Sequence, residues 1–212
     1  KIRFNHGTVD KYLGDGVMAF WGAPVPSEQH AMHACQAALN CRKGIQEMNQ
    51  SWEVKGKKPF WSRIGIHTGV TLVGNLGSQS RMNYTVVGDS VNLASRLEGV
   101  NKIYKTEIIV SSDTRDAAEK EFLFRPLGSV AVKGKQQEVE IYELVESITQ
   151  ATQEQIQFSK DFTTALNLFK DGDFSGAKIL FTKIGDQYPT DHPTKIYIEK
   201  CLEKERSGIS SI

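Results

Sequence analysis

The strongest constraint on the fold of this chain is an Asp-Gly turn near its start, which lies between two runs typical of β-strands. The first run is Thr8–Leu13, the turn is Gly14-Asp15-Gly16, and the second, nearly all-apolar run is Val17–Trp21. An Asp-Gly pair between two such runs is among the clearest hairpin signals in a sequence. Residues 1–23 are therefore predicted to form a β-hairpin.

A long helix is predicted after the hairpin. Pro24 and Pro26 interrupt the chain, and Ser27 is expected to cap the helix. Apolar side chains then recur at helical spacing, at Ala31, Ala34, Cys35, Ala38, Leu39 and later Ile45. Residues 50–60 are polar and Lys-rich, which is typical of a surface loop.

Strands and helices alternate in the next part of the chain. Further strands are predicted within residues 62–74, 82–87, 106–110, 128–132 and 139–144, and further helices at residues 91–100 and 112–119. Because the alternation lacks a strict βαβ repeat, the expected fold class is α+β with a mostly antiparallel sheet and flanking helices.

Composition excludes several classes of protein. The 212 residues are 39% hydrophobic and 24% charged, which argues against a disordered chain. A net charge of +1 gives no basic field for nucleic acid. No apolar run reaches the roughly 18–20 residues of a membrane span, and the opening Lys1-Ile2-Arg3, with no apolar segment behind it, predicts no signal peptide. Cys35, Cys41 and Cys201 fit neither a disulfide framework nor a zinc site, so a reducing, cytoplasmic location is expected.

The C-terminal part of the chain has a different pattern. Composition changes near residues 148–157, which are predicted to be a linker or a connecting helix, and residues 158–212 are predicted to be a helical tail. Small, bulky and helix-ending residues lie where a 34-residue tetratricopeptide repeat has them: Ala165, Leu168, Phe174, Ala177, Phe181 and Pro189. An ordinary amphipathic helix pair is the alternative. In both cases the tail is expected to bind a partner or pack, without carrying chemistry.

The predicted hairpin tip carries two candidate functional residues, Lys11 and Asp15. A carboxylate on a turn flanked by Gly14 and Gly16 can approach a hard cation such as magnesium closely. The alternative is that Asp15 is simply a turn residue, and the hairpin considered by itself favours that alternative.

Asn92 and Arg96 are four residues apart on a predicted helix, so they share one face. An amide beside a guanidinium suits a ribose–phosphate ligand. The alternative for Arg96 is a surface ion pair with Glu98 or another acid. Lys133, in a Gly turn between two predicted strands, can reach a polyphosphate, although a solvated hairpin tip is the more common fate of such a lysine.

Taken together and in this order, these motifs make the chain resemble the class III nucleotidyl cyclases over roughly residues 6–145. The matching strings are HGTVDKYLGDGVMAFWGAP, RIGIHTGVTLVGNLGSQSRMNYTVVGDSVNLASRLEG and VAVKGKQQEVEIYEL. The resemblance implies a ferredoxin-like α+β catalytic domain at residues 1–147, which works as a dimer with active sites at the interface. It also implies a lyase that converts a nucleoside triphosphate to its cyclic 3′,5′-monophosphate and pyrophosphate in intracellular signalling.

The resemblance assigns a role to each candidate residue. Asp15 matches the second metal-binding aspartate of the family, and Lys11 and Thr85 match the pair that reads the purine. Asn92 matches the residue that orients the ribose, and Arg96 matches the arginine that stabilises the transition state. Lys133 matches the lysine that binds the triphosphate. The implied mechanism uses two Mg²⁺ or Mn²⁺ ions per site to assist attack of the ribose 3′-hydroxyl on the α-phosphate. His67 lies in a family motif without an assignable role, and a structural histidine is expected.

The purine-reading pair predicts ATP as the substrate. Lys11 can donate to adenine N1, and Thr85 can accept from the 6-amino group. Guanylyl relatives carry Glu and Cys at these positions, so the pair favours adenylate cyclase. Threonine in place of the aspartate of many adenylyl cyclases resembles the bicarbonate-responsive subgroup.

One family motif has no match in the chain. Members of the family take their first metal aspartate from an upstream F-x-D-I-x-x-F-T string, so we expect that strand to precede Lys1 in a longer parent protein, which can also carry a membrane anchor upstream. The 212 residues alone are then expected to have little activity. The alternative function is a catalytically silent, nucleotide-binding regulatory module with a helical interaction tail. The six matching site residues favour the enzyme.

Overall fold

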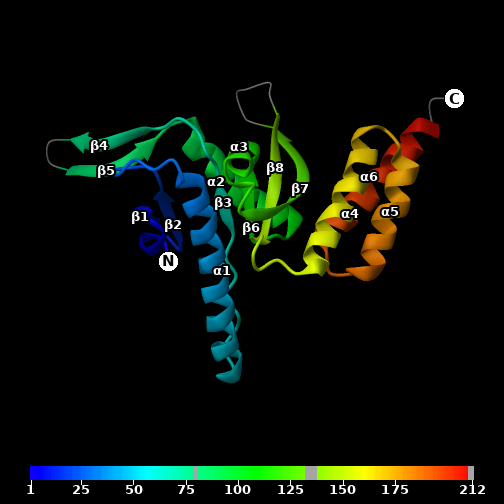
Figure 1. Ribbon diagram of the computed structural model, residues 1–212, viewed down its shortest axis with the longest axis horizontal. Coiled ribbons are helices and arrows are strands. Elements are labelled where there is room, and N and C mark those ends of the chain that lie inside the picture. The colour runs from blue at the N-terminus through cyan, green and yellow to red at the C-terminus, as the bar shows by residue number, and fades with distance from the viewer. Residues whose placement is uncertain (79–80, 132–137, 210–212) are drawn as a thin grey trace.

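The computed structural model describes residues 1–78, 81–131 and 138–209. Its centre is a four-stranded sheet in the order β3-β6-β8-β7 (Figure 1). The strands are β3 (Ile64–Ile66), β6 (Ile108–Ser111), β7 (Phe122–Ala131) and β8 (Glu138–Ser147). Strands β3 and β6 are parallel and the other neighbours are antiparallel, so the predicted α+β class is confirmed.

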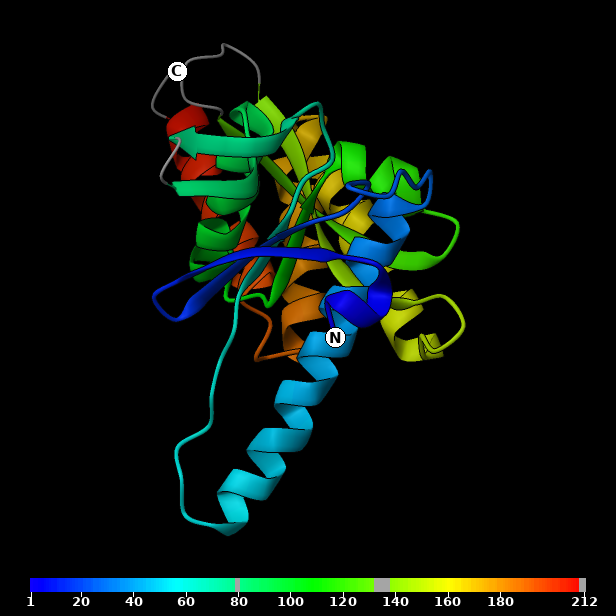
Figure 2. The same ribbon diagram turned by 90° about the vertical axis from the view of Figure 1, so that its left-hand side faces the viewer.

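Helices cover both faces of this sheet. Helices α1 (His30–Val54) and α3 (Ser112–Ala118) lie on one face, and α2 (Asp89–Tyr104) lies on the other (Figure 2). Strand β6 packs against helices on both faces of the sheet because its side chains alternate. Ile108 and Val110 belong to the core under α1, and Ile109 belongs to the core under α2. Gly65 of β3 lets the strand pack directly on α2, since a Cβ there would collide with the α2 backbone at Ala94 and Glu98.

Two hairpins extend from the sheet. Strands β1 (Thr8–Leu13) and β2 (Gly16–Phe20) form the first, which confirms the predicted Asp-Gly hairpin. Strands β4 (Leu72–Ser78) and β5 (Arg81–Val87) form the second, and β5 leads directly into α2 (Figure 1). A short 3₁₀ helix, Arg3–Asn5, precedes the first hairpin, and the Trp21 indole N–H donates to the Asn5 carbonyl at 2.8 Å.

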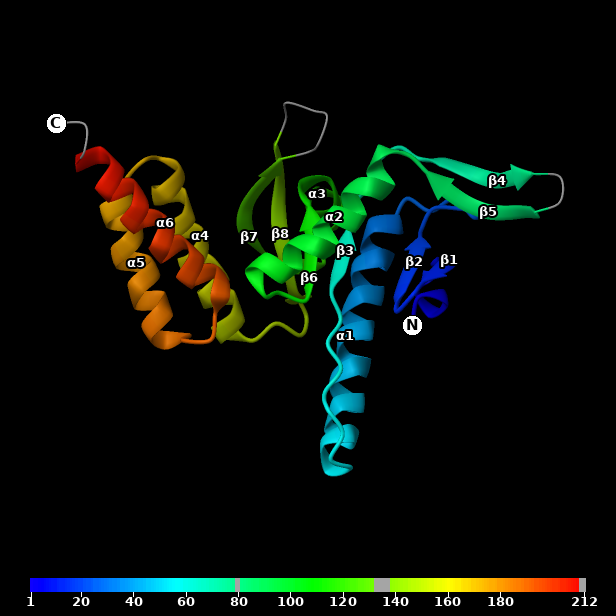
Figure 3. The same ribbon diagram turned by 180° about the vertical axis from the view of Figure 1, so that it is seen from behind.

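The C-terminal segment forms three helices, α4 (Gln153–Lys170), α5 (Phe174–Gln187) and α6 (His192–Ile209), which are seen from behind in Figure 3. Thr152 and Gln155 form a capping box at the start of α4. The aromatic side chains of Phe162, Phe181 and Tyr197 lie in one hydrophobic cluster with residues of α2 and the sheet. Among the described residues, no helix is long and apolar enough to cross a membrane.

Three local predictions were wrong. Helix α1 begins at His30 instead of at a Ser27 cap, because the Ser27 hydroxyl accepts from the Gln29 N–H ahead of the helix. The same helix runs to Val54, into the predicted loop at residues 50–60, where its solvent-exposed turns are as polar as a loop. Strand β7 begins at Phe122, six residues before the predicted strand, because Pro126 lies at a register shift where a proline is tolerated.

Candidate active site on the two hairpins and helix α2

The two hairpins meet at Asp10, Lys11 and Thr85. The Thr85 hydroxyl in β5 donates to Asp10 Oδ2 in β1 at 2.5 Å, across 75 residues of sequence. Lys11 Nζ lies 3.6 Å from Asp10 Oδ1. The side chain of Asp10 is 1% exposed and that of Lys11 is 43% exposed, so the ammonium is open to a ligand while the carboxylate is enclosed. The fold therefore brings the two predicted purine-reading residues to the same carboxylate.

Asp15 lies in the turn between β1 and β2 and is exposed. It has no hydrogen bond or ion pair with any residue in the described ranges. An exposed carboxylate is a suitable ligand for a hard cation, but Mg²⁺ needs several oxygens. Within those ranges, no group of three or more His, Cys, Asp or Glu side chains lies close enough to hold a metal ion.

Helix α2 presents Asn92 and Arg96 one turn apart at its N-terminal end. Leu93 and Leu97 anchor the helix in the core, which leaves Asn92 exposed and Arg96 half-buried. Glu98 pairs with Arg63 at 2.7 Å, so the alternative of an Arg96–Glu98 pair is wrong. In the part of the chain that the structure describes, Arg96 has no hydrogen-bond or ion-pair partner. Its guanidinium is therefore available to an anion.

Two other sequence candidates have different outcomes. Lys133 lies outside the described residues. His67 is nearly buried, and its Nδ1 lies 2.8 Å from Ser111 Oγ, so it joins the end of β3 to the end of β6. This contact favours the structural role expected for His67.

Sequence reasoning missed Asp10 as a site residue. One signal was present: consecutive charged residues at positions 10 and 11 break the period-two alternation of a strand. The structure has a register shift there, because Val9 pairs with Ala19 and Lys11 pairs with Met18. The contact with Thr85 depends on the tertiary fold and has no local signal.

The hairpins also expose large apolar side chains on neighbouring strands. The most exposed are Tyr12, Leu13 and Val17 on the first hairpin and Leu72 and Met82 on the second. Large apolar side chains that are exposed on both hairpins favour an interface there.

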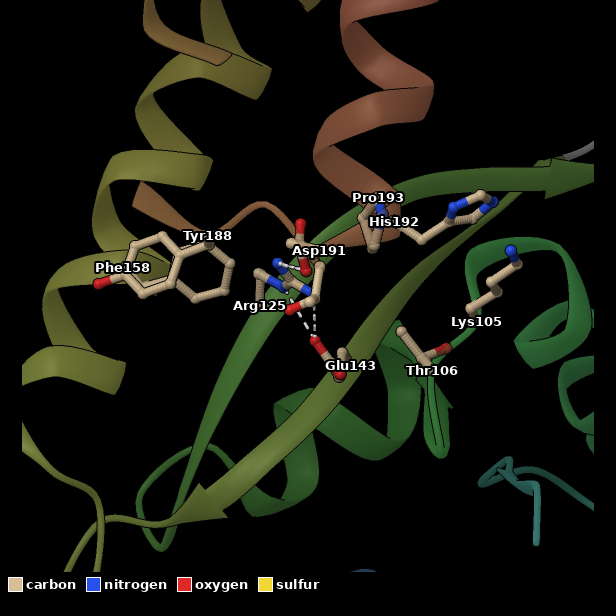
Figure 4. Close-up of a pocket in the computed structure, with 10 residues that line it drawn as sticks. Lys105, Thr106, Arg125, Glu143, Phe158, Tyr188, Asp191, His192 and Pro193 are labelled. Carbon is tan, nitrogen blue, oxygen red and sulfur yellow. Dashed lines mark hydrogen bonds and ion pairs between the residues drawn. The ribbon is translucent and has the colours of Figure 1, made fainter. Parts of the chain in front are cut away.

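A separate pocket of about 270 Å³ lies between the sheet and the helical tail (Figure 4). Its main polar group is Arg125, which pairs with Glu143 at 2.6 Å and with Asp191 at 2.9 Å. Burial by itself would lower the pKa of Arg125, but the two carboxylates raise that pKa above its ordinary value. Because this guanidinium is already paired with two carboxylates, we interpret the pocket as part of the attachment of the tail to the sheet.

Comparison with known proteins agrees with this geometry. Residues 5–146 match the family described as the adenylate and guanylate cyclase catalytic domain. The chain belongs to this family. Over 144 residues it is 42% identical to Adenylate cyclase 1 of Rhizobium meliloti (strain 1021), a match that covers 68% of this chain and 22% of that protein.

Two further cyclases are similar over different parts of the chain. The terminal-differentiation-specific adenylate cyclase of Dictyostelium discoideum is 31% identical over 203 residues, which is 93% of this chain and 9% of that protein, so the match includes most of the helical tail. The adenylyl cyclase CyaB from P. aeruginosa has a similar crystal structure, with a TM-score of 0.62 and 34% identity over 71% of this chain and 77% of that one. The cyclase domain spans less than a quarter of either curated relative.

Proposed function

We propose that the protein containing this cyclase domain is an adenylate cyclase, which converts ATP to 3′,5′-cyclic AMP and pyrophosphate. The observation that carries the proposal is the approach of Lys11 and Thr85 to one carboxylate, Asp10. The Lys11 ammonium can donate to adenine N1, and the Thr85 oxygen can accept from the 6-amino group. The family includes enzymes for both purines, and this pair is what favours ATP.

The groups on α2 suit the sugar and the reacting phosphate. The exposed amide of Asn92 can hold the ribose so that its 3′-hydroxyl faces the α-phosphate. The guanidinium of Arg96, which no other described residue pairs with, can stabilise charge that develops on the α-phosphate as the oxygen attacks in line. Lys133 is proposed to hold the departing pyrophosphate. Positioning and charge stabilisation supply most of the catalysis in such phosphoryl transfers.

Asp15 is the residue of this chain that we propose as a ligand for Mg²⁺ or Mn²⁺, with two ions in a complete site. When bound, such ions lower the pKa of the 3′-hydroxyl and balance charge on the phosphates. Asp15 offers one carboxylate, so further oxygens have to come from the triphosphate and from outside the described residues.

The exposed apolar side chains of the two hairpins support a second copy of this domain as the partner. Tyr12 and Leu13 lie three and two residues before Asp15, and Met82 lies on the same strand as Thr85. An interface that covers these side chains therefore adjoins the proposed site. In a two-fold dimer each site then takes Asp15 from one protomer and the nucleotide-reading residues from the other.

Two finer proposals concern regulation. Thr85 at the position of an aspartate supports activation by bicarbonate, which is tested by measuring the cyclase rate with and without bicarbonate at constant pH. The helical tail is proposed to be tetratricopeptide-like and to bind a protein partner in the cytoplasm.

The test of the proposed function is a cyclase assay on the full-length protein. ATP is supplied with Mg²⁺ or Mn²⁺, and cyclic AMP is quantified by chromatography. Arg63→Ala, which removes the surface pair with Glu98, is the matched control and should keep its activity. Nucleotide binding without cyclic AMP formation under either metal would show instead that the domain is a silent regulatory module.

A further inference from the structure

Strand β1 contains a β-bulge at Asp10, and the bulge directs this side chain inward. The register advances from Val9↔Ala19 to Lys11↔Met18, which leaves Asp10 as the extra residue. A bulge of this kind re-aims a side chain that regular pleating would send elsewhere. The carboxylate of Asp10 is thereby enclosed, with 1% exposure, between the second hairpin and Lys11.

The Asp10 carboxylate controls the direction of the Thr85 hydroxyl. A carboxylate can only accept hydrogen bonds, so Thr85 has to donate its one proton to Asp10. Thr85 is 6% exposed, and Asp10 is the one acceptor that its hydroxyl binds within the described residues. The remaining lone pairs of its oxygen are then all that it offers to a ligand.

We propose that Asp10 is a positioning residue for base selectivity, because it fixes Thr85 as a hydrogen-bond acceptor and holds Lys11 beside it as a donor. This inference rests on the proposed function. Adenine presents a 6-amino donor to Thr85, which the lone pairs satisfy. Guanine presents its O6 acceptor at the same place. O6 then faces the lone pairs of the Thr85 oxygen, and no hydrogen bond forms because neither atom offers a proton. Asp10 itself does not touch the nucleotide.

The alternative is that Asp10 only joins the two hairpins. The two roles differ in what Asp10→Asn does, because an amide has the same shape but can donate to Thr85. The Thr85 proton is then free to turn towards guanine O6. If Asp10 positions Thr85, Asp10→Asn should reduce the preference for adenine over guanine. If Asp10 is purely structural, the variant should bind both nucleotides equally more weakly or have a lower Tm.

The experiment measures binding of 3′-deoxy-ATP and 3′-deoxy-GTP to the full-length protein by calorimetry with Mg²⁺. Neither analogue has the hydroxyl needed for cyclisation, so binding is separated from turnover. Wild type should prefer the adenine analogue by at least about tenfold, and Asp10→Asn should reduce this preference to about threefold or less, since an unmatched buried polar pair is costly. Asp10→Ser is the second variant if Asp10→Asn does not fold.

A double-mutant cycle tests whether Asp10 acts through Thr85. Thr85→Val should also abolish the preference, and adding Asp10→Asn to it should change the preference little further. Thr85→Ser keeps the hydroxyl and should retain the preference. Thr106→Val, which removes another buried hydroxyl bond, to Asn101 at 2.9 Å, is the stability control and should retain it as well.

The outcomes separate this inference from the proposed function. The role of Asp10 would be overturned if Asp10→Asn kept the wild-type preference for the adenine analogue, or if it weakened binding of both analogues equally. It would also be overturned if the two substitutions changed the preference additively, or if the wild-type protein showed no preference. A wild type that prefers the adenine analogue but forms no cyclic AMP from ATP would instead overturn the cyclase, and the binding data would still decide the role of Asp10.

Discussion

The guanidinium of Arg125 in strand β7 donates to the carboxylate of Asp191, just before helix α6, at 2.9 Å. Arg125 also pairs with Glu143 of β8, and its side chain is only 2% exposed. The helical tail is thus attached to the sheet by a buried charge network in addition to the shared hydrophobic cluster. Leu93 and Leu97 of α2 belong to that cluster, so the helix that carries Asn92 and Arg96 rests on the same core as the tail.

Arg125→Ala should destabilise the protein strongly. The change leaves Glu143 and Asp191 without their cation in a buried place, and breaking such a network typically costs about 3–5 kcal/mol. Urea unfolding should show a lower free energy of unfolding. Arg63→Ala, whose pair is about half exposed, is the control and should cost about 1 kcal/mol or less. Equal effects of the two changes would mean that the network contributes no special stability.

The sequence predicted the fold best where a local rule determines the structure. The Asp-Gly turn placed the first hairpin, and the apolar spacing from Ala31 to Leu39 placed the buried face of α1. It failed where tertiary contacts override the local pattern. Pro126 interrupts the strand signal of β7, yet the bulge beside it accommodates the proline and lets the strand continue.

The residues of the candidate site could be predicted from the family motif, but the contacts between them could not. The family motif named Lys11, Thr85, Asn92 and Arg96 as candidates, and the structure brings Lys11 and Thr85 to one carboxylate. Asp10 depends on a bulge and on a partner 75 residues away, so no window of sequence contains both halves of the interaction.

Acidification should destabilise the protein through His33. Burial lowers the pKa of His33 from 6.5, and the neighbouring His6 and His30 lower it further. The folded protein therefore disfavours the protonated ring, whereas the unfolded chain takes up the proton near pH 6.5. This contribution to stability is fully present above that pH and falls as the pH drops below it.

The measurement is urea unfolding of wild type and His33→Gln between about pH 7.5 and 5.5, the range in which histidine titrates. The variant should lose less stability than wild type over this range. His192→Gln, on α6, is the control and should lose as much as wild type. A wild-type pH profile in His33→Gln would assign the acid sensitivity to other groups.

Exchange of the purine-reading pair should alter substrate choice. Lys11→Glu together with Thr85→Cys reverses the hydrogen-bonding polarity that faces the base. ATP turnover should fall at least about 10²-fold, since each unpaired buried polar group costs about 1–3 kcal/mol, and some GTP turnover should appear. Initial rates with each nucleotide measure the effect in the full-length protein. A variant that prefers ATP as strongly as wild type would refute the assignment of this pair.

Arg96→Ala should lower kcat far more than it changes KM. The guanidinium is proposed to act on charge that forms only in the transition state, and a preorganised donor of this kind contributes about 10²-fold or more. Steady-state kinetics with ATP separate the two constants. An unchanged kcat with a raised KM would assign Arg96 to ground-state binding, and no change in either constant would remove it from the site.

The proposed shared site makes a sharp prediction for mixed mutants. Asp15→Ala and Arg96→Ala proteins should each be inactive as homodimers, because every site contains the lesion. In a heterodimer of the two variants, one of the two shared sites contains both substitutions, and the other contains the unchanged Asp15 and Arg96. Since equal co-expression makes about half of the dimers mixed, with one intact site of two, about a quarter of wild-type activity should return.

Differently tagged copies allow the mixed dimers to be captured and assayed directly. Co-expression ensures that subunits exchange before purification, and wild type co-expressed with Arg96→Ala gives the reference for one damaged partner. Activity in the captured dimers would support an interface site in which Asp15 serves the nucleotide bound by the other chain. Captured heterodimers that stay inactive would place Asp15 and Arg96 in a site formed within one chain.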